Sequence, residues 1–264
     1  MFRQILLALC AALVLMPLAA LAKDTTPHIV VGQTVHVTLD KGESADYTIS
    51  LNKGDYYIVL DAKRSDDSSR NIQATVQLLK NNGVLVDGNL LYCNEIGVAT
   101  RVGRKFHNAK PLAARLRLTH EQSIPTDYWL TVIPAAKIKL LAFGYGGDIK
   151  PAKIGPDNGV GGDIAKYDTA FYSITLPPGK WSISLGLQLP AGERSTNLQG
   201  QIDLLTAYGI PDKESFVFVN EIGNQTRKET AITITKPKPI LLRVMNTSGD
   251  KVYHYDMTIE KATD

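Results

Sequence analysis

The chain has 264 residues, with 29 lysines and arginines against 26 aspartates and glutamates, giving a net charge of +3 at neutral pH. Because this near-balanced charge is shared evenly by the two halves of the chain, we expect no nucleic-acid partner. The only cysteines are Cys10 and Cys93. Cys10 lies in an N-terminal apolar segment that we expect to be removed, so the mature chain would hold no intrachain disulfide.

The first 22 residues have the pattern of a secretory signal peptide. Arg3 supplies a positive charge, residues 5–21 are almost all apolar, and Ala20-Leu21-Ala22 is a small-x-small cleavage site. The sequence therefore predicts a mature protein that begins at Lys23 and resides in the periplasm or outside the cell. The alternative is a retained N-terminal anchor. No later apolar run is long enough to span a bilayer, so we expect no stable membrane insertion.

Short runs of alternating apolar and polar residues follow one another through the first half of the chain. They lie at residues 35–39, 47–51, 56–60, 76–78, 116–118 and 128–132. Alternation with period two is typical of half-buried strands, and no helical period of useful length is present. Asn52-Lys53-Gly54-Asp55 joins two such runs and predicts a hairpin. These features favour a β-sandwich or barrel.

The second half of the chain repeats the first. Residues 94–101, Asn-Glu-Ile-Gly-Val-Ala-Thr-Arg, return at 220–227 with six of eight positions identical. The apolar positions of the other runs also return, at offsets of 125 to 127 residues, with the same parity. Since a one-residue slip would turn a strand inside out, this agreement predicts two similar β-sandwich domains, at 23–134 and 160–264. Between them, residues 135–159 form a Gly/Pro-rich linker.

Each copy resembles a bacterial pre-peptidase C-terminal (PPC) domain. The shared pattern is a Tyr-x-Ile-x-Leu strand, a Gly turn and an aromatic-x-Ile strand. An Asn-Ile-Gln-Ala-Thr-Val-Gln-Leu or Asn-Leu-Gln-Gly-Gln-Ile-Asp-Leu strand follows, and a Tyr-x-Leu-Thr-Val or Tyr-x-Met-Thr-Ile strand closes the copy. The resemblance covers about residues 32–133 and 160–260. It implies two tandem jelly-roll-like sandwiches of a kind that is not catalytic and that helps secreted enzymes to bind substrate or stay folded.

Catalytic and metal-binding patterns are weak. The histidines are His28, His36, His107, His120 and His254, and no Gly-x-Ser-x-Gly motif accompanies them. No His or Cys pair has the spacing of zinc ligands, so we expect no enzyme, metal or cofactor. Two alternatives stay open: a catalytic site assembled from distant residues, for instance in the linker, and a calcium site in the same region. The oxygen ligands for calcium would come from Asp148, Asp157, Asn158 and Asp163, although such residues are also common in turns.

Two candidate polar sites remain. Glu95 with Arg101, and Glu221 with Arg227, recur in both copies. Each pair would either fix a turn through charge-assisted hydrogen bonds or bind a ligand.

The other candidate is a basic stretch of the first copy that holds no acid between Glu95 and Glu121. It would form an anion-binding face, with the aromatics Tyr128 and Trp129 beside it, or else a solvated strand edge. Its basic residues are Arg101, Arg104, Lys105, His107, Lys110, Arg115 and Arg117.

These observations predict a secreted or periplasmic, non-enzymatic protein that binds a macromolecule, either an acidic glycan or a protein. The alternative is a periplasmic inhibitor or immunity protein that blocks a toxin or hydrolase. The oligomeric state stays open. Cys93 corresponds to Val219 in the second copy, which predicts a buried, unreactive thiol; the rival interpretation is a functional thiol.

Overall fold

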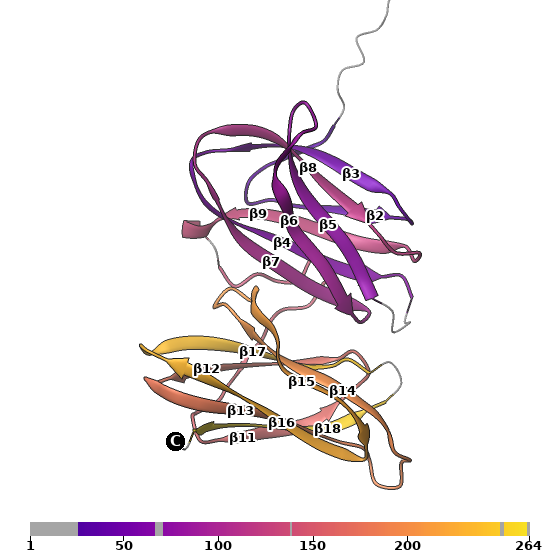
Figure 1. The fold of residues 1–264 in the computed structure, drawn as a ribbon, viewed down its shortest axis with the longest axis vertical. Helices are drawn as coiled ribbons and strands as arrows, with labels where there is room; N and C mark the ends of the chain where they lie inside the picture. Colours follow the sequence, from indigo (N-terminus) through magenta and orange to yellow (C-terminus); the bar gives the residue numbers. More distant parts are fainter. Residues whose placement is uncertain (1–25, 67–70, 138, 249–250, 263–264) are drawn as a thin grey trace, which may run out of the picture.

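A computed structural model describes residues 26–66, 71–137, 139–248 and 251–262. The expected signal peptide and the start at Lys23 lie outside these residues. Within the described residues the chain folds into two β-sandwiches, one after the other along the long axis of the molecule (Figure 1). In this part of the chain we find no helix long and apolar enough to cross a membrane.

The first sandwich consists of a five-stranded and a four-stranded sheet. The five-stranded sheet has the order β1 (His28–Ile29), β3 (Ser44–Leu51), β8 (Leu112–His120), β5 (Asn71–Lys80) and β6 (Leu85–Ile96). The four-stranded sheet has the order β2 (Thr34–Leu39), β9 (Thr126–Pro134), β4 (Gly54–Arg64) and β7 (Ala99–Asn108). A short 3-10 turn, η1 (Ala135–Lys137), ends this sandwich.

The second sandwich repeats the same order. Its five-stranded sheet consists of β10 (Ala152–Lys153), β12 (Thr169–Leu176), β17 (Lys238–Asn246), β14 (Thr196–Leu205) and β15 (Pro211–Gly223). Its four-stranded sheet consists of β11 (Gly159–Ile164), β18 (Tyr253–Lys261), β13 (Gly179–Gln188) and β16 (Gln225–Ile234). The prediction of an all-β chain with two tandem jelly-roll-like sandwiches is confirmed.

Two details differ from the sequence analysis. The strands on either side of Asn52–Asp55 do not form a hairpin, because β3 pairs with β8 in one sheet while β4 pairs with β9 and β7 in the other. Both strands bury one apolar face, and two such faces can meet across the core as well as side by side. The predicted linker, 135–159, also includes a strand of the second sandwich, since β10 pairs with β12. A two-residue strand is too short to show an alternating pattern.

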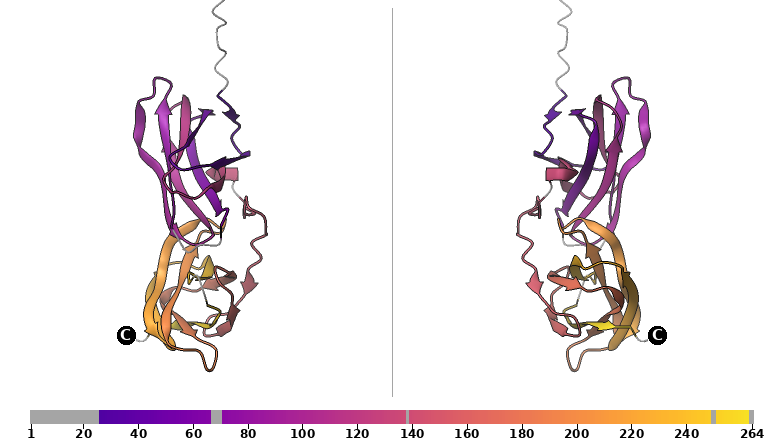
Figure 2. Two further views of the ribbon diagram at one scale, coloured as in Figure 1. Left: turned by 90° about the vertical axis from the view of Figure 1, so that its right-hand side faces the viewer. Right: turned by 90° about the vertical axis from the view of Figure 1, so that its left-hand side faces the viewer.

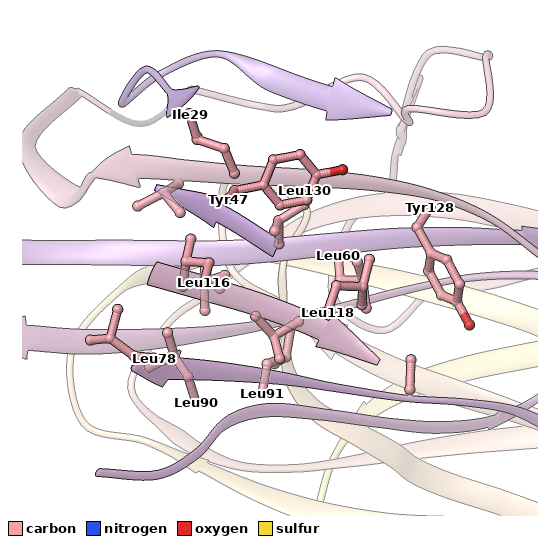
Figure 3. Packing of buried hydrophobic residues seen from close by; sticks show 14 of the residues in the cluster. Ile29, Tyr47, Leu60, Leu78, Leu90, Leu91, Leu116, Leu118, Tyr128 and Leu130 are labelled. Carbon is pink, nitrogen blue, oxygen red and sulfur yellow. The ribbon is translucent and has the colours of Figure 1, made fainter. Parts of the chain in front are cut away.

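Each sandwich has its own apolar core between its two sheets. In the first, Tyr47, Leu60, Leu116 and Leu130 come from both sheets and pack together (Figure 3). Cys93 is part of this core and is fully buried, which confirms the predicted burial. Its counterpart Val219 is fully buried in the second core. The corresponding positions opposite them are Ala74 and Gly200, so a small apolar side chain suits this site.

The two sandwiches meet through a third, smaller apolar cluster. The turn between β14 and β15 brings Ile210 against Val59 and Ile133, which lie on the outer face of the first four-stranded sheet. Tyr208, in the same turn, meets Tyr57 edge-on, with ring centroids 6.1 Å apart. A Cβ atom at Gly103 would collide with Ile210, so the edge strand β7 needs glycine there.

The same face of the second sandwich is polar. The β-sheet registers place Ser182, Ser184, Glu229 and Glu260 where the first sandwich has Tyr57, Val59, Gly103 and Ile133. The apolar docking face therefore belongs to the first sandwich.

Candidate functional site

The predicted anion-binding residues do not form one face. Arg104 and Lys105 are neighbours on β7, so their side chains leave opposite faces of the sheet. Arg115 and Arg117 project from β8, in the other sheet of the sandwich. Arg101 is only 1% exposed. The prediction of a single basic face is wrong, because a run of charges that is continuous in sequence is divided between faces by strand alternation and by the change of sheet.

Several of these charges are also neutralised. Lys105 Nζ lies 2.9 Å from Asp55, and Arg117 holds both carboxylate oxygens of Asp46 at 2.8 Å. The hydrogen bonds from Arg117, with a further contribution from Arg115, hold the pKa of Asp46 below its ordinary value.

The remaining residues proposed for this face are separated as well. Lys110 is exposed in the loop after β7, and Arg104 donates a long hydrogen bond, 3.4 Å, to the carbonyl of Asn89. Tyr128 is fully buried in the core, whereas its neighbour Trp129 lies on the outer face and stacks on His36. These two aromatics therefore do not flank a basic surface.

The two glutamate–arginine pairs are also paired differently from the prediction. Arg101 binds Asp61 rather than Glu95, and Arg227 binds Asp256 while Glu221 contacts Lys228. Asp61 lies opposite Arg101 on the neighbouring strand β4, and strand register decides such contacts. Sequence proximity suggested the wrong acid.

Arg101 fixes the segment that joins the sandwiches, residues 139–147, which we call the strap. Its Nε and Nη2 atoms bind the two Asp61 oxygens at 2.5 and 2.7 Å. Nη1 and Nη2 also donate to the carbonyls of Leu141 and Ala142, at 2.8 and 2.6 Å. Asp61 in turn accepts from the backbone N–H of Gly144 at 2.7 Å. This bidentate, buried pair therefore holds three successive points of the strap.

Aromatic rings of the strap continue this contact toward the second sandwich. Phe143 lies under the Arg101 guanidinium, 4.4 Å from its centre, and stacks on Tyr145 with centroids 4.8 Å apart. Phe143 also contacts Phe171 of β12, at 5.7 Å. Burial, followed by the nearby Asp61 carboxylate, raises the pKa of Tyr145, so its hydroxyl stays neutral at physiological pH. The strap crosses the junction along one side of the molecule (Figure 2).

A groove of about 600 Å³ opens at the start of the strap. Its walls come from β1 and the chain after it, the end of β3, the start of β4, the end of β9, η1 and the strap. The lining residues are His28, Ile29, Val30, Val31, Gly32, Ser50, Asn52, Tyr56, Ile133, Pro134, Lys137, Lys139 and Leu141.

The groove combines an apolar floor with a basic rim. Ile29 and Ile133 are buried beneath it, while Lys137 and Lys139 are exposed. His28 adds a ring that contacts the Thr48 hydroxyl at 3.1 Å. None of the described lining residues is acidic. An anion with an apolar part is the chemical class that suits such a surface.

The residues considered for metal binding lie apart in the described structure. No group of three His, Cys, Asp or Glu side chains is placed to hold a metal ion in this part of the chain. Asp148 pairs with Lys150 and Asp163 with His254, so the residues considered for calcium are divided among separate contacts.

A buried histidine and tyrosine lie beside Cys93 in the first core. His120 Nδ1 is 2.7 Å from the Tyr128 hydroxyl, and both side chains are fully buried. Burial lowers the pKa of His120 and raises that of Tyr128. The second sandwich has Asn246 at the His120 position, where its side chain binds the carbonyls of Ile164 and Lys251. This position therefore anchors a loop in the second copy, whereas in the first it holds a histidine–tyrosine pair in the core.

Sequence reasoning missed the groove. Its lysines stand in a short basic segment after β9 that carries no motif. The groove exists because the segment after β9 passes close to β1, and no local sequence pattern predicts that contact. The Gly/Pro-rich composition indicated a linker but not the surface that the linker covers.

No family model matches the chain, and no curated protein matches it. Among solved structures, a tandem CBM22 domain from Paenibacillus barcinonensis Xyn10C has 10% identity and a TM-score of 0.23, covering 81% of this chain and 82% of that one. The PBSX exported protein XepA has 12% identity and a TM-score of 0.27, covering 88% of each chain. A triple-jelly-roll protein of an archaeal virus has 11% identity and a TM-score of 0.26, with 89% of this chain and 54% of that one covered. Similarity at this level supports no transfer of a ligand to this chain.

Proposed function

We propose that the protein is a non-catalytic binding protein whose first sandwich holds an acidic macromolecule in the groove beside β1. The observation that carries this proposal is the groove's composition: two exposed lysines and a histidine stand above an apolar floor, with no acid among the described lining residues. Exposed cations attract a polyanion over several ångströms, and the apolar floor adds area that excludes water.

The second sandwich serves as an internal comparison. At the positions of Ile133 and Pro134 it has Glu260 and Lys261. The repeated fold therefore forms without these two apolar lining residues, so core stability alone does not explain their presence in the first copy. Ile133 is already required in the first copy because it packs against Ile210 in the docking cluster, and a ligand in the groove would use the same apolar surface.

The proposal places the protein outside the cytoplasm, following the N-terminal signal pattern of residues 1–22. Such a location suits a binding protein that meets acidic polysaccharides or acidic protein surfaces. The PPC-like pattern of the sequence points in the same direction, because it implies a binding role without catalysis.

The test is binding to two acidic polymers, a sulfated polysaccharide and poly-glutamate, by wild type and by the double variant Lys137→Glu, Lys139→Glu. We expect the variant to lose most of its binding, and wild-type binding to weaken as salt rises, because exposed charges are screened. The matched control is Lys180→Glu with Lys236→Glu, two exposed lysines of the second sandwich. Equal loss in both double variants, or no loss in either, would refute the groove as the site.

A further inference from the structure

The groove and the junction between the sandwiches share one wall. Leu141 of the strap lines the groove, and its carbonyl accepts a hydrogen bond from Arg101. The Leu141 N–H donates to the carbonyl of Tyr208 in the second sandwich, at 3.2 Å. One residue is thus bound to both sandwiches, packs against the junction cluster and also lines the candidate ligand site.

The anchor of this wall is buried and rigid. Arg101 is 1% exposed, and its partner Asp61 is 4% exposed. The space around the strap is also closed, because a Cβ atom at Gly144 would collide with the Trp129 ring. Ile149, just beyond the strap, is buried and packs against Gly209 of the docked turn. Strap, turn and ion pair therefore form one packed unit.

We infer that Asp61 and Arg101 are positioning residues for the groove, so that an acidic ligand bound there and the docking of the second sandwich stabilise each other. This inference rests on the proposed function. The residues act through the strap: they hold Leu141, and with it Lys139 two residues earlier, against the floor formed by Ile29 and Ile133. Coupling of this kind is reciprocal, because each event favours the same position of the strap.

The repeat provides a matched control for Arg101. Arg227 occupies the same position in the second sandwich, where it binds the exposed Asp256 and contacts neither strap nor groove in the described structure. Arg101→Gln should therefore weaken binding of the acidic polymer about fivefold or more, the usual lower range of coupling between sites. Arg227→Gln should leave binding within experimental error of wild type.

A second variant addresses the case in which Arg101→Gln does not fold. Gly144→Ala displaces the strap without leaving a buried charge unpaired, since the added methyl would meet Trp129. Its control is Gly88→Ala, at a position where a Cβ meets nothing within 4 Å. We expect Gly144→Ala, and not Gly88→Ala, to weaken binding by a similar factor while the unfolding transition stays cooperative.

The readout that separates positioning from general stability is proteolysis of the strap, followed with and without poly-glutamate. In wild type the polymer should slow cleavage near Gly146, and in Gly144→Ala this protection should be lost. If both strap variants fold and bind the polymer as wild type does, the inference is wrong and the groove proposal stands. If Lys137→Glu with Lys139→Glu leaves binding unchanged, the proposed function itself fails.

Discussion

Arg101 and Arg227 occupy the same position in the two sandwiches, but each binds an aspartate on a different strand. In the first sandwich the acid is Asp61 on β4, directly opposite the arginine. In the second, that position is Gly186, and the acid is Asp256, one strand further on β18. A Cβ atom at Gly186 would collide with the Asp256 carboxylate, so the glycine makes room for the relocated acid.

In the five-stranded sheets, too, equivalent arginines bind aspartates that lie on different strands. Arg117 and Arg243 are equivalent, yet Arg117 binds Asp46 on β3 and Arg243 binds Asp203 on β14. Although burial opposes its charge, Asp203 raises the pKa of Arg243. In the four-stranded sheets the pair Asp61–Arg101 is buried and its counterpart Asp256–Arg227 is more exposed. In the five-stranded sheets the pair Asp203–Arg243 is buried and its counterpart Asp46–Arg117 is more exposed.

This difference in burial predicts unequal stability effects. Arg101→Gln leaves the Asp61 carboxylate buried without its cation, and we expect it to lower the free energy of unfolding by about 3–5 kcal/mol. Arg227→Gln, at a half-exposed pair, should cost at most about 1 kcal/mol. Urea denaturation of both variants measures the difference, and equal losses would contradict the assigned burial.

The junction also predicts the behaviour of a nicked chain. Limited proteolysis should cut first within residues 135–168, and most readily at the exposed residues 146–148, just beyond the hydrogen bonds that hold the strap. Because the apolar cluster around Ile210 remains, the two fragments should stay together in gel filtration and separate in urea. First cleavage outside residues 135–168 would show that the boundary is misplaced.

Cys93 should resist alkylation in the native protein and react once the chain is unfolded, because the thiol is fully buried and donates to the Ile72 carbonyl. Cys93→Val, which copies Val219, should fold with a stability change below about 1.5 kcal/mol. Thiol labelling with and without denaturant makes the measurement. Rapid labelling of the folded protein would instead favour the functional-thiol interpretation.

His120 predicts a pH dependence of stability. Its pKa is lowered in the folded state, chiefly by burial, with Asp40 opposing this effect and Arg64 adding to it. The neutral ring therefore contributes stability that is present above the ordinary pKa of 6.5 and is lost as pH falls through the lowered value.

The His120 prediction is tested by melting curves between pH 8 and pH 5. His120→Asn, which copies Asn246, should flatten the decline in Tm toward acid. His254→Asn, at an exposed histidine, should retain it. An unchanged acid slope in His120→Asn would show that other groups are responsible.

The sequence predicted the strands well because their information is local. Alternation at Tyr47, Ile49 and Leu51 identifies one buried face, and its return 125 residues later at Tyr172, Ile174 and Leu176 identifies the second copy. The site was much less predictable. Asp61 is separated from Arg101 by forty residues, and only the strand register brings them together.

Because the acidic partner of each arginine lies on a different strand in the two copies, a comparison of their sequences does not reveal the ion pairs. Aligning the copies places Asp61 against Gly186, so conserved arginines appear without conserved partners. Glu95 and Glu221, which do align, were the natural but wrong choice. The groove could not be predicted for a different reason. Its lysines look like ordinary surface residues in the sequence, and the strap that forms one of its walls is placed only by the tertiary fold.

The polar face of the second sandwich makes the tandem directional. A third copy attached behind the second would meet Ser182 and Ser184 where the first offers Tyr57 and Val59, and Glu229 where Gly103 admits an incoming isoleucine. Its docking turn would find no apolar surface to pack on and would bury the Glu229 carboxylate, which is costly away from water. The two halves are thus not interchangeable modules, because only the first presents an apolar outer face on which such a docking turn can pack.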